Sequence, residues 1–178
     1  MSEKPRTNHM EYMEGMEVLD SDVMDRVITA MNEYDYDQYT EADVRRALSH
    51  DMKSVEDFKA FLSPAALPLL EEMAQAAQLE TRKHFGNSVY MFTPIYIANY
   101  CENYIGEACK IARKYFKLVG LEVYPMNSDE YAYLHQCGAD YVTVFQETYN
   151  SDKYEKLHLA GHKRVFPYRF NAQERALK

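Results

Sequence analysis

The chain contains 178 residues, which is enough for one domain with a substantial buried core. Its 20 basic and 28 acidic side chains give a net charge of −8, and no run of lysine or arginine stands out, so we expect neither a nucleic-acid surface nor an anionic-membrane surface. No apolar run approaches the ~20 residues of a membrane span, and the N-terminus has no apolar signal core, so the sequence predicts a cytoplasmic protein. Its three cysteines are too few for a disulfide framework.

The first half of the chain is predicted to be helical. Residues 1–19 are charged, rich in methionine and without a clear period, which predicts a flexible N-terminal arm. Residues 20–86 carry apolar side chains at helical spacing and are predicted to form a helical segment. Within it, Thr40 and Ser54 each begin a pattern that resembles a capping box, and Gly86 is a natural end for the longest helix. The apolar residues on one side of the helix that begins after Ser54 are Val55, Phe58 and Leu62.

An apolar stretch lies at the centre of the chain. Val89 to Ala98 is almost unbroken apolar and aromatic, which is typical of a strand buried on both faces of a parallel sheet. The stretch runs into a polar end that contains Cys101, and the carboxyl ends of parallel strands are where α/β proteins place their chemistry. By itself, Cys101 is compatible with a metal ligand, a nucleophile or simple packing. Cys109 and Cys137 lack the spacing of metal ligands, and we interpret them as structural.

Helices and strands alternate in the second half. Strands are predicted at Leu121 to Tyr124, Tyr141 to Phe145 and Val165 to Phe170, with helices between them. Alternation of this kind indicates right-handed βαβ units and a parallel sheet. The last helix stops at Lys178 without a cap, from which we expect the chain to be incomplete at its C-terminal end.

Polar side chains follow two of the predicted strands. Gln146, Glu147 and Thr148 come directly after one strand, where ligand contact and hydrogen bonding at the start of a loop are both compatible with the sequence. Arg169 follows another apolar segment. It could bind a carboxylate bidentately or form a surface salt bridge.

Several segments of the chain carry a resemblance to a known family. FTPIYIANYCEN resembles the start of the cluster loop of the radical S-adenosylmethionine enzymes that cleave tyrosine, and in particular the 2-iminoacetate synthase family of thiamine thiazole biosynthesis. LSPAALPLLEEMAQAAQLETRKHFGN is similar to the helical segment that precedes that loop, and VTVFQETY, from Val142 to Tyr149, is a specific match. The likeness covers nearly all of the chain from about Tyr34 onward.

The resemblance implies a fold and a cofactor. The fold class is α/β: residues 87–178 are expected to form an incomplete (β/α) barrel of the radical-SAM type with parallel strands, preceded by the helical segment. The family binds a 4Fe–4S cluster through a C-x-x-x-C-x-x-C motif, and the open iron of the cluster binds S-adenosylmethionine. Only Cys101 matches this motif, because the chain passes directly to Ile105 and Ala108 where the other two cysteines are expected. The rest of the cluster loop and the next helix and strand are therefore expected to be missing through an internal deletion.

The resemblance also implies roles for individual residues. Cys101 matches a metal ligand of the cluster, Arg169 lies where the family can hold the carboxylate of the cofactor, and Gln146, Glu147 and Thr148 match a motif that faces cofactor or tyrosine. The implied reaction is that of a carbon–carbon lyase, which splits tyrosine into p-cresol and dehydroglycine (2-iminoacetate). Its implied partners are tyrosine, a thiazole synthase subunit and a flavodoxin or ferredoxin electron donor.

We predict that this chain is inactive, because one thiolate cannot hold the cluster on which the chemistry depends. Two alternatives stay open. One is the tyrosine lyase that matures iron-only hydrogenases, and the other is a non-catalytic fragment that binds a partner such as thiazole synthase.

Overall fold

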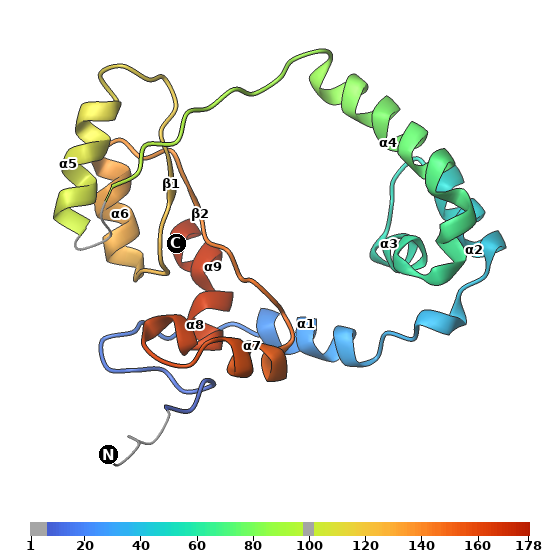
Figure 1. The fold of residues 1–178 in the computed structure, drawn as a ribbon, viewed down its shortest axis with the longest axis horizontal. Coiled ribbons are helices and arrows are strands. Elements are labelled where there is room, and N and C mark those ends of the chain that lie inside the picture. Colours follow the sequence, from blue (N-terminus) through green and yellow to red (C-terminus); the bar gives the residue numbers. More distant parts are fainter. Residues whose placement is uncertain (1–6, 98–101) are drawn as a thin grey trace. The chain divides into compact units, whose positions relative to one another are not determined.

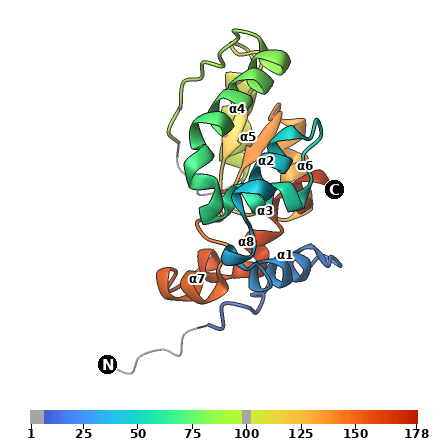
Figure 2. The same cartoon turned by 90° about the vertical axis from the view of Figure 1, so that its right-hand side faces the viewer.

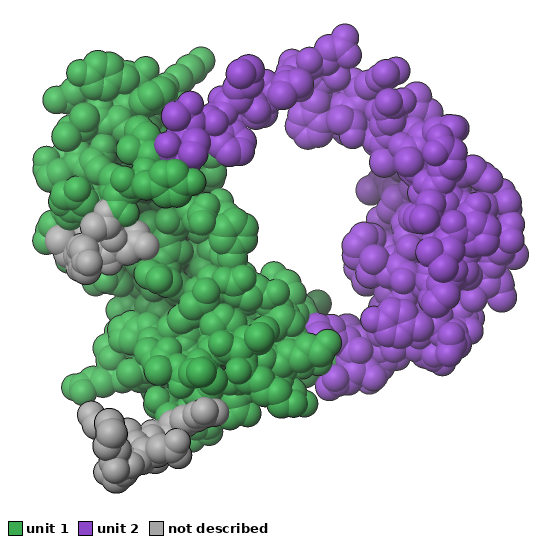
Figure 3. Space-filling view, in the orientation of Figure 1, with its two compact units in different colours: residues 1–29, 95–178 green, residues 30–94 purple. Residues whose placement is uncertain are grey.

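The computed structural model describes residues 7–97 and 102–178. It consists of two compact units, one formed by residues 1–29 and 95–178 and the other by residues 30–94 (Figure 3). The domain boundaries that the sequence predicts, at residues 20 and 87, stay a prediction. Among the described residues, no helix has both the length and the apolar character needed to cross a membrane.

The unit of residues 30–94 is helical, as predicted (Figures 1 and 2). Its elements are η1 (Tyr36–Gln38), α2 (Glu41–Ser49), α3 (Val55–Leu62), η2 (Pro64–Leu69) and α4 (Leu70–Phe85), and α1 (Val23–Asn32) ends in it. Thr40 and Ser54 form the capping boxes expected at the starts of α2 and α3, each with an aspartate three positions later. Gly86 ends α4 at a φ of 60°, a left-handed value that favours glycine.

The core of this unit consists of small and medium apolar residues. Its fully buried members are Val44, Ala47, Ala60, Ala66 and Leu69. Helix α3 contributes Ala60, and its other buried residue is Asp57. The apolar side chains that share one side of α3, namely Val55, Phe58 and Leu62, are exposed. The small side chain of Ala60 allows α2 to approach α3 closely, so packing selects that side of α3 rather than the side with the larger residues.

The other unit alternates helices with two short strands. Its elements from residue 102 onward are α5 (Glu102–Ala112), β1 (Gly120–Glu122), α6 (Ser128–Gln136), β2 (Tyr141–Thr143), α7 (Ser151–Leu157), η3 (His162–Arg164), α8 (Phe166–Phe170) and α9 (Ala172–Leu177). The strands β1 and β2 are parallel, with Gly120 opposite Tyr141 and Glu122 opposite Thr143. In the described residues the sheet has these two strands. The α/β class and the parallel pairing are therefore confirmed, and the partial barrel stays a prediction.

The interior of this unit is formed where α5 packs against α6 beside the strands. Its buried members are Ile105, Cys109, Val119, Leu134, Cys137 and Ala139. Gly106 allows the close contact between the two helices, since a Cβ atom there would lie 2.8 Å from the Tyr133 ring and 2.9 Å from Cys137 Sγ. Cys109 and Cys137 are free and buried, in agreement with their structural interpretation.

Two predicted strands are absent from the structure. Residues 89–97 form no regular element, and their apolar side chains are exposed; Ala98 lies outside the described residues. Val165 to Phe170 is largely the short helix α8, because Pro167 stands in the first turn, where its fixed φ suits a helix and its missing N–H removes no helical hydrogen bond.

The described part of the N-terminal arm is held by several contacts. The Arg164 guanidinium donates from Nε to the Thr7 carbonyl oxygen at 2.6 Å, and the Phe166 amide donates to the His9 carbonyl oxygen at 2.8 Å. Further along, Glu17 accepts from Lys178 Nζ at 2.8 Å. Residues 7–19 are therefore anchored at both ends to the C-terminal elements, although the sequence predicts a flexible arm.

Candidate functional site

The parallel register of β1 and β2 places the segments that follow them at the same edge of the sheet. Pairing ends at Glu122 and Thr143, and the Val123 amide still donates to the Thr143 carbonyl oxygen at 3.4 Å. The polar residues Gln146, Glu147 and Thr148 leave the sheet at this edge. Strand ends of this kind carry the ligand sites of α/β proteins, so we treat this edge as the candidate site.

Glu147 stands in an unusual backbone conformation. Its φ is 70°, and the Thr148 amide donates to the Gln146 carbonyl oxygen at 2.9 Å, which closes a three-residue turn of the γ type around it. A positive φ is uncommon for a residue with a side chain and tends to occur at functional sites. The turn directs the Glu147 carboxylate toward Lys163 Nζ, at 2.9 Å, and Arg169 Nη2, at 3.7 Å. The hydrogen bond from Lys163, followed by the charges of Lys163 and Arg169, lowers the pKa of Glu147.

Arg169 and Gln146 are buried and incompletely paired. The Arg169 side chain is 5% exposed, and its Nε donates to the Phe145 carbonyl oxygen. Among the described residues, Arg169 Nη1 and Gln146 Nε2 have no hydrogen-bond partner. A buried donor without a partner costs about 1–3 kcal/mol, so the site favours a ligand that brings acceptors. A carboxylate has acceptors only, and its charge suits the guanidinium.

Thr148 does not share this environment. Its hydroxyl accepts from the Asn150 amide at 3.2 Å and so shapes the loop before α7. The structure thus brings Glu147 and Arg169 together, buries Gln146 at the preceding position of the chain, and assigns Thr148 a hydrogen bond at the start of a loop. Lys163 joins the group from η3, and no pattern in the sequence marks it.

A cavity of about 710 Å³ lies beside the ion pair, at the carboxyl side of β1. The N-terminal arm, the first turn of α5, the loop after β1, the segment before α8 and α8 itself line it, and the lining residues include Met16, Glu102, Ile105, Met126, Lys163 and Tyr168. Its volume falls in the range of small-molecule sites. Of the three charged residues of the candidate site, Lys163 lines the cavity, and through its pair with Glu147 it links the cavity to the ion pair.

The described residues do not fit an iron–sulfur cluster. Cys101, the predicted ligand, lies outside them, and within them no group of three His, Cys, Asp or Glu side chains is arranged to hold a metal ion. The two positions where the motif needs cysteine, Ile105 and Ala108, lie on α5. The Ile105 side chain is 2% exposed and is part of the core beside Cys109. That position therefore lies in the core, where it also forms part of the cavity wall.

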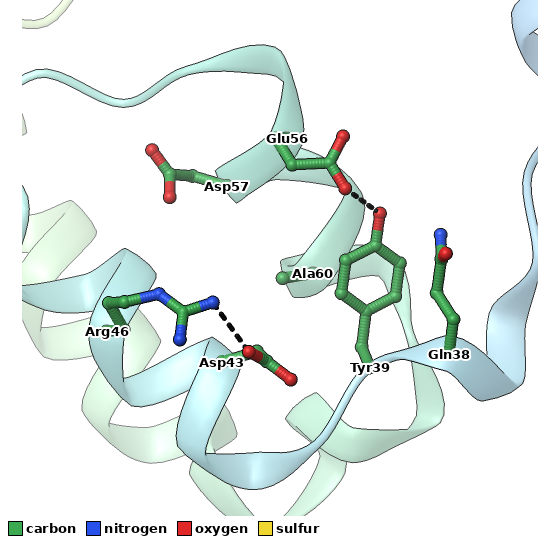
Figure 4. Close-up of a pocket in the computed structure, with 7 residues that line it drawn as sticks. All are labelled: Gln38, Tyr39, Asp43, Arg46, Glu56, Asp57 and Ala60. Atoms are coloured by element: carbon green, nitrogen blue, oxygen red, sulfur yellow. Dashed lines mark hydrogen bonds and ion pairs between the residues drawn. The ribbon is translucent and has the colours of Figure 1, made fainter.

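A smaller pocket of about 210 Å³ lies in the unit of residues 30–94 (Figure 4). Tyr39 donates to Glu56, and Arg46 pairs with Asp43. Burial and the hydrogen bond to Glu56 raise the pKa of Tyr39 to about 12. The hydrogen bonds from Thr40 lower the pKa of Asp43 to about 2. These polar groups are occupied with capping and pairing, so we assign the pocket a structural role.

Solved structures establish which fold the chain resembles. A crystal structure of HydG, a maturase of the FeFe-hydrogenase, superposes with a TM-score of 0.74 over 88% of this chain and 48% of that protein, at 18% sequence identity. The HydG of Carboxydothermus hydrogenoformans gives a TM-score of 0.51 over 88% of this chain and 46% of that protein, at 16% identity. The fold is therefore that of part of HydG.

Sequence relatives agree with the predicted resemblance. The 2-iminoacetate synthase of Escherichia coli K12 is 32% identical over 76% of this chain and 50% of its own length, and that of Salmonella typhimurium LT2 is 30% identical over the same shares. The chain thus resembles 2-iminoacetate synthase, as predicted, and spans about half the length of these relatives. No protein-family model matches the chain.

The extent of the match bears on the predicted internal deletion. Each match extends over 188 positions, which is more than the 178 residues of this chain. The same match contains only 76% of the residues of this chain, so many of its positions are filled by the relative alone. The relatives therefore contain residues inside the matched region that have no counterpart here.

Proposed function

We propose that this chain derives from a radical S-adenosylmethionine tyrosine lyase of the 2-iminoacetate synthase kind. The similarity to 2-iminoacetate synthases supports the family, and the buried donors of Arg169 and Gln146 support a site for a carboxylate-bearing cofactor. In this proposal Arg169 binds the carboxylate of S-adenosylmethionine or its analogues, Gln146 donates the second hydrogen bond, and Glu147 holds Arg169 and Lys163 in place.

We further propose that the chain as it stands does not cleave tyrosine. The single observation that carries this proposal is the burial of Ile105. The family motif requires a thiolate there, but α5 begins at Glu102 and turns position 105 into the apolar core. In this chain the position holds a buried isoleucine, and Ala108 on the same helix provides no ligand either.

Anaerobic reconstitution with iron and sulfide tests this proposal. We expect substoichiometric iron, no stable cluster absorbance and no p-cresol from tyrosine, S-adenosylmethionine and a reductant. The E. coli 2-iminoacetate synthase, treated in the same way, is the positive control. A stable cluster that disappears in Cys101→Ala, together with p-cresol release from the unmodified chain, would show the proposal to be wrong.

A second candidate is a lyase of the hydrogenase-maturase kind, and the TM-score of 0.74 to HydG favours it. A third is a non-catalytic partner of thiazole synthase or of a full-length relative. Co-expression of the tagged chain with thiazole synthase, and separately with a full-length relative, tests the third candidate, because a specific partner is expected to co-purify in a fixed ratio. Recovery with neither partner at a fixed ratio would contradict the binding role.

A further inference from the structure

Residues 7–17, which we call the strap, form one wall of the cavity at the carboxyl side of β1. The cavity measures about 710 Å³, and Glu14, Gly15 and Met16 belong to its lining. Figure 1 shows the strap in blue beside α7 and α8. The strap and the rest of the cavity wall lie in one compact unit, that of residues 1–29 and 95–178. A movement of the strap would therefore change both the size and the lining of the cavity.

Asn127 fastens the C-terminal end of the strap. Its Nδ2 donates to the Gly15 carbonyl oxygen at 2.8 Å, and its Oδ1 accepts from the Glu17 amide at 2.9 Å. The same oxygen accepts from the Tyr168 hydroxyl at 2.9 Å. Because Asn127 and Tyr168 also line the cavity, one carboxamide ties the strap to two other parts of the cavity wall. The Glu17 carboxylate adds a hydrogen bond from the Ser128 amide at 2.6 Å.

The turn η3 fastens the other end of the strap and also belongs to the candidate site. Arg164 of η3 donates from Nε to the Thr7 carbonyl oxygen at 2.6 Å. The preceding residue, Lys163, lines the cavity and pairs through Nζ with Glu147 at 2.9 Å. Consecutive residues of one short turn thus connect the strap, the cavity and the ion pair.

The strap contributes little to the interior of its unit. Of residues 7–17, all of which the structure describes, only Met16 is buried, and none lies in a helix or a strand. Met16 packs against Val165 and Tyr168. Gly15 has a φ of 83°, and a Cβ atom there would meet no described atom within 4 Å, so the backbone has room to turn at this position. Segments with few buried apolar contacts open at a lower free energy than the whole fold, and small residues often serve as their hinges.

We propose that the strap is a movable wall of the cavity. It is closed while Asn127 and Glu17 hold it, and it opens when these bonds break, with the rest of the unit still folded. In the closed state a ligand in the cavity contacts Glu14 and Met16. Since the open state lacks these contacts, a ligand that uses them keeps the strap closed, and the strap in turn slows release of the ligand. The proposal does not depend on which ligand binds, so a failure of carboxylate binding at Arg169 would leave it standing.

Thiol labelling of the full chain tests whether the strap opens by itself. Met16→Cys places a reporter under the strap, in a background where Cys101→Ser removes the cysteine outside the described residues. Cys109 and Cys137 are buried in the core of the same unit and report its unfolding. With a methanethiosulfonate reagent, we expect the thiol at position 16 to react at least about 100-fold faster than Cys109, because it needs local opening only. Equal rates would mean that the strap separates only when the unit unfolds, and would overturn the proposal.

A matched pair of variants tests which bonds close the strap. Glu17→Gln is expected to speed labelling at position 16 by about fivefold, because Ser128 and Lys178 lose the charge that they bond. Glu11→Gln is the control, since the Glu11 carboxylate accepts from Asn8 Nδ2 within the strap, at 2.8 Å. We expect it to change nothing. Faster labelling in both variants, or in neither, would contradict closure through Glu17.

A second reporter tests whether the strap closes the cavity. Met126→Cys, in the same Cys101→Ser background, places a thiol in the cavity lining. We expect Glu17→Gln to speed labelling at position 126 and Glu11→Gln to leave it unchanged. A rate at position 126 that does not respond to Glu17→Gln would show that the strap is not a wall of the cavity.

Hydrogen exchange of the chain without added cysteines provides an independent measurement. The Glu17 amide, which donates to Asn127, is expected to exchange faster than the Cys109 amide inside α5, each taken relative to its intrinsic rate. Equal protection at the two amides would overturn local opening. Circular dichroism of every variant distinguishes an opened strap from a lost fold.

Discussion

Glu147 and Arg169 meet across the candidate site, with 3.7 Å between Glu147 Oε1 and Arg169 Nη2. Arg169 is buried on α8, whereas Glu147 stands in a strained turn after β2 and also pairs with Lys163. The pair leaves Arg169 Nη1 without a partner among the described residues. In the proposed function this guanidinium binds a carboxylate, and the first prediction tests that role.

Replacement of Arg169 by glutamine should weaken the binding of S-adenosylhomocysteine, an unreactive analogue that carries the same carboxylate, by about tenfold or more. The reason is that glutamine provides neither the charge nor the fork of donors. Isothermal titration calorimetry measures the effect, with exposed Lys156→Gln as the control. Equal affinities for the unmodified chain and Arg169→Gln would show that Arg169 does not bind the carboxylate.

A double variant Ile105→Cys with Ala108→Cys restores the cysteine spacing of the family motif without restoring the loop. We expect no gain in iron after reconstitution, because residue 105 faces the core, and a loss of about 1–2 kcal/mol in the free energy of unfolding, because a buried isoleucine is truncated. Iron analysis and urea denaturation measure the two effects. Assembly of a full cluster in this variant would contradict the proposed inactivity.

Replacement of Glu17 by glutamine should loosen the N-terminal arm. The hydrogen bond from Lys178, followed by that from the Ser128 amide, lowers the pKa of Glu17 from 4.5 to about 2. Because the folded pKa is depressed, this stabilisation is present above pH 4.5 and is lost as the pH falls from about 4.5 to about 2. We expect the protection of the Ser128 amide, taken relative to its intrinsic exchange rate, to fall over that interval and to be low at every pH in Glu17→Gln. The variant should also lose about 1 kcal/mol of stability.

Gly106→Ala should destabilise the packing of α5 against α6. The added methyl group would lie 2.9 Å from Cys137 Sγ, and overpacking of this kind costs about 1–3 kcal/mol, which exceeds the gain in helix propensity. Thermal unfolding measures the loss. Adding Cys137→Ala should recover part of it, because that change removes the buried sulfur. A variant as stable as the parent chain would indicate that the two helices separate easily.

Ser54→Ala should cost about 1 kcal/mol by removing the cap of α3. The Ser54 hydroxyl accepts from the Asp57 amide at 3.1 Å and donates to its carboxylate at 2.8 Å. Ser49→Ala is the matched control, since Ser49 donates to the Arg46 carbonyl oxygen inside α2 and caps no N-terminus. Urea denaturation should therefore separate the two alanine variants.

The candidate site could be predicted only in part. Gln146 and Glu147 could be predicted because polar residues that follow an apolar strand form a local pattern. Arg169 could be predicted because it stands at the end of an apolar segment. The element that carries Arg169 was predicted as a strand and is a helix. Lys163 was not predicted at all, since its pairing with Glu147 depends on how η3 folds back toward the end of β2. The ligand role of these residues stays a prediction.

The local features of this protein follow from the amino-acid sequence: the capping boxes at Thr40 and Ser54 and the helix end at Gly86. These features depend on a few neighbouring residues, whose short-range hydrogen bonds and conformational preferences act in any context. The exposure of Val89 to Ile97 and the burial of Ile105 could be learned only from the folded chain. An apolar segment becomes a covered strand only if other elements pack on both of its faces, and that depends on residues far away in the chain.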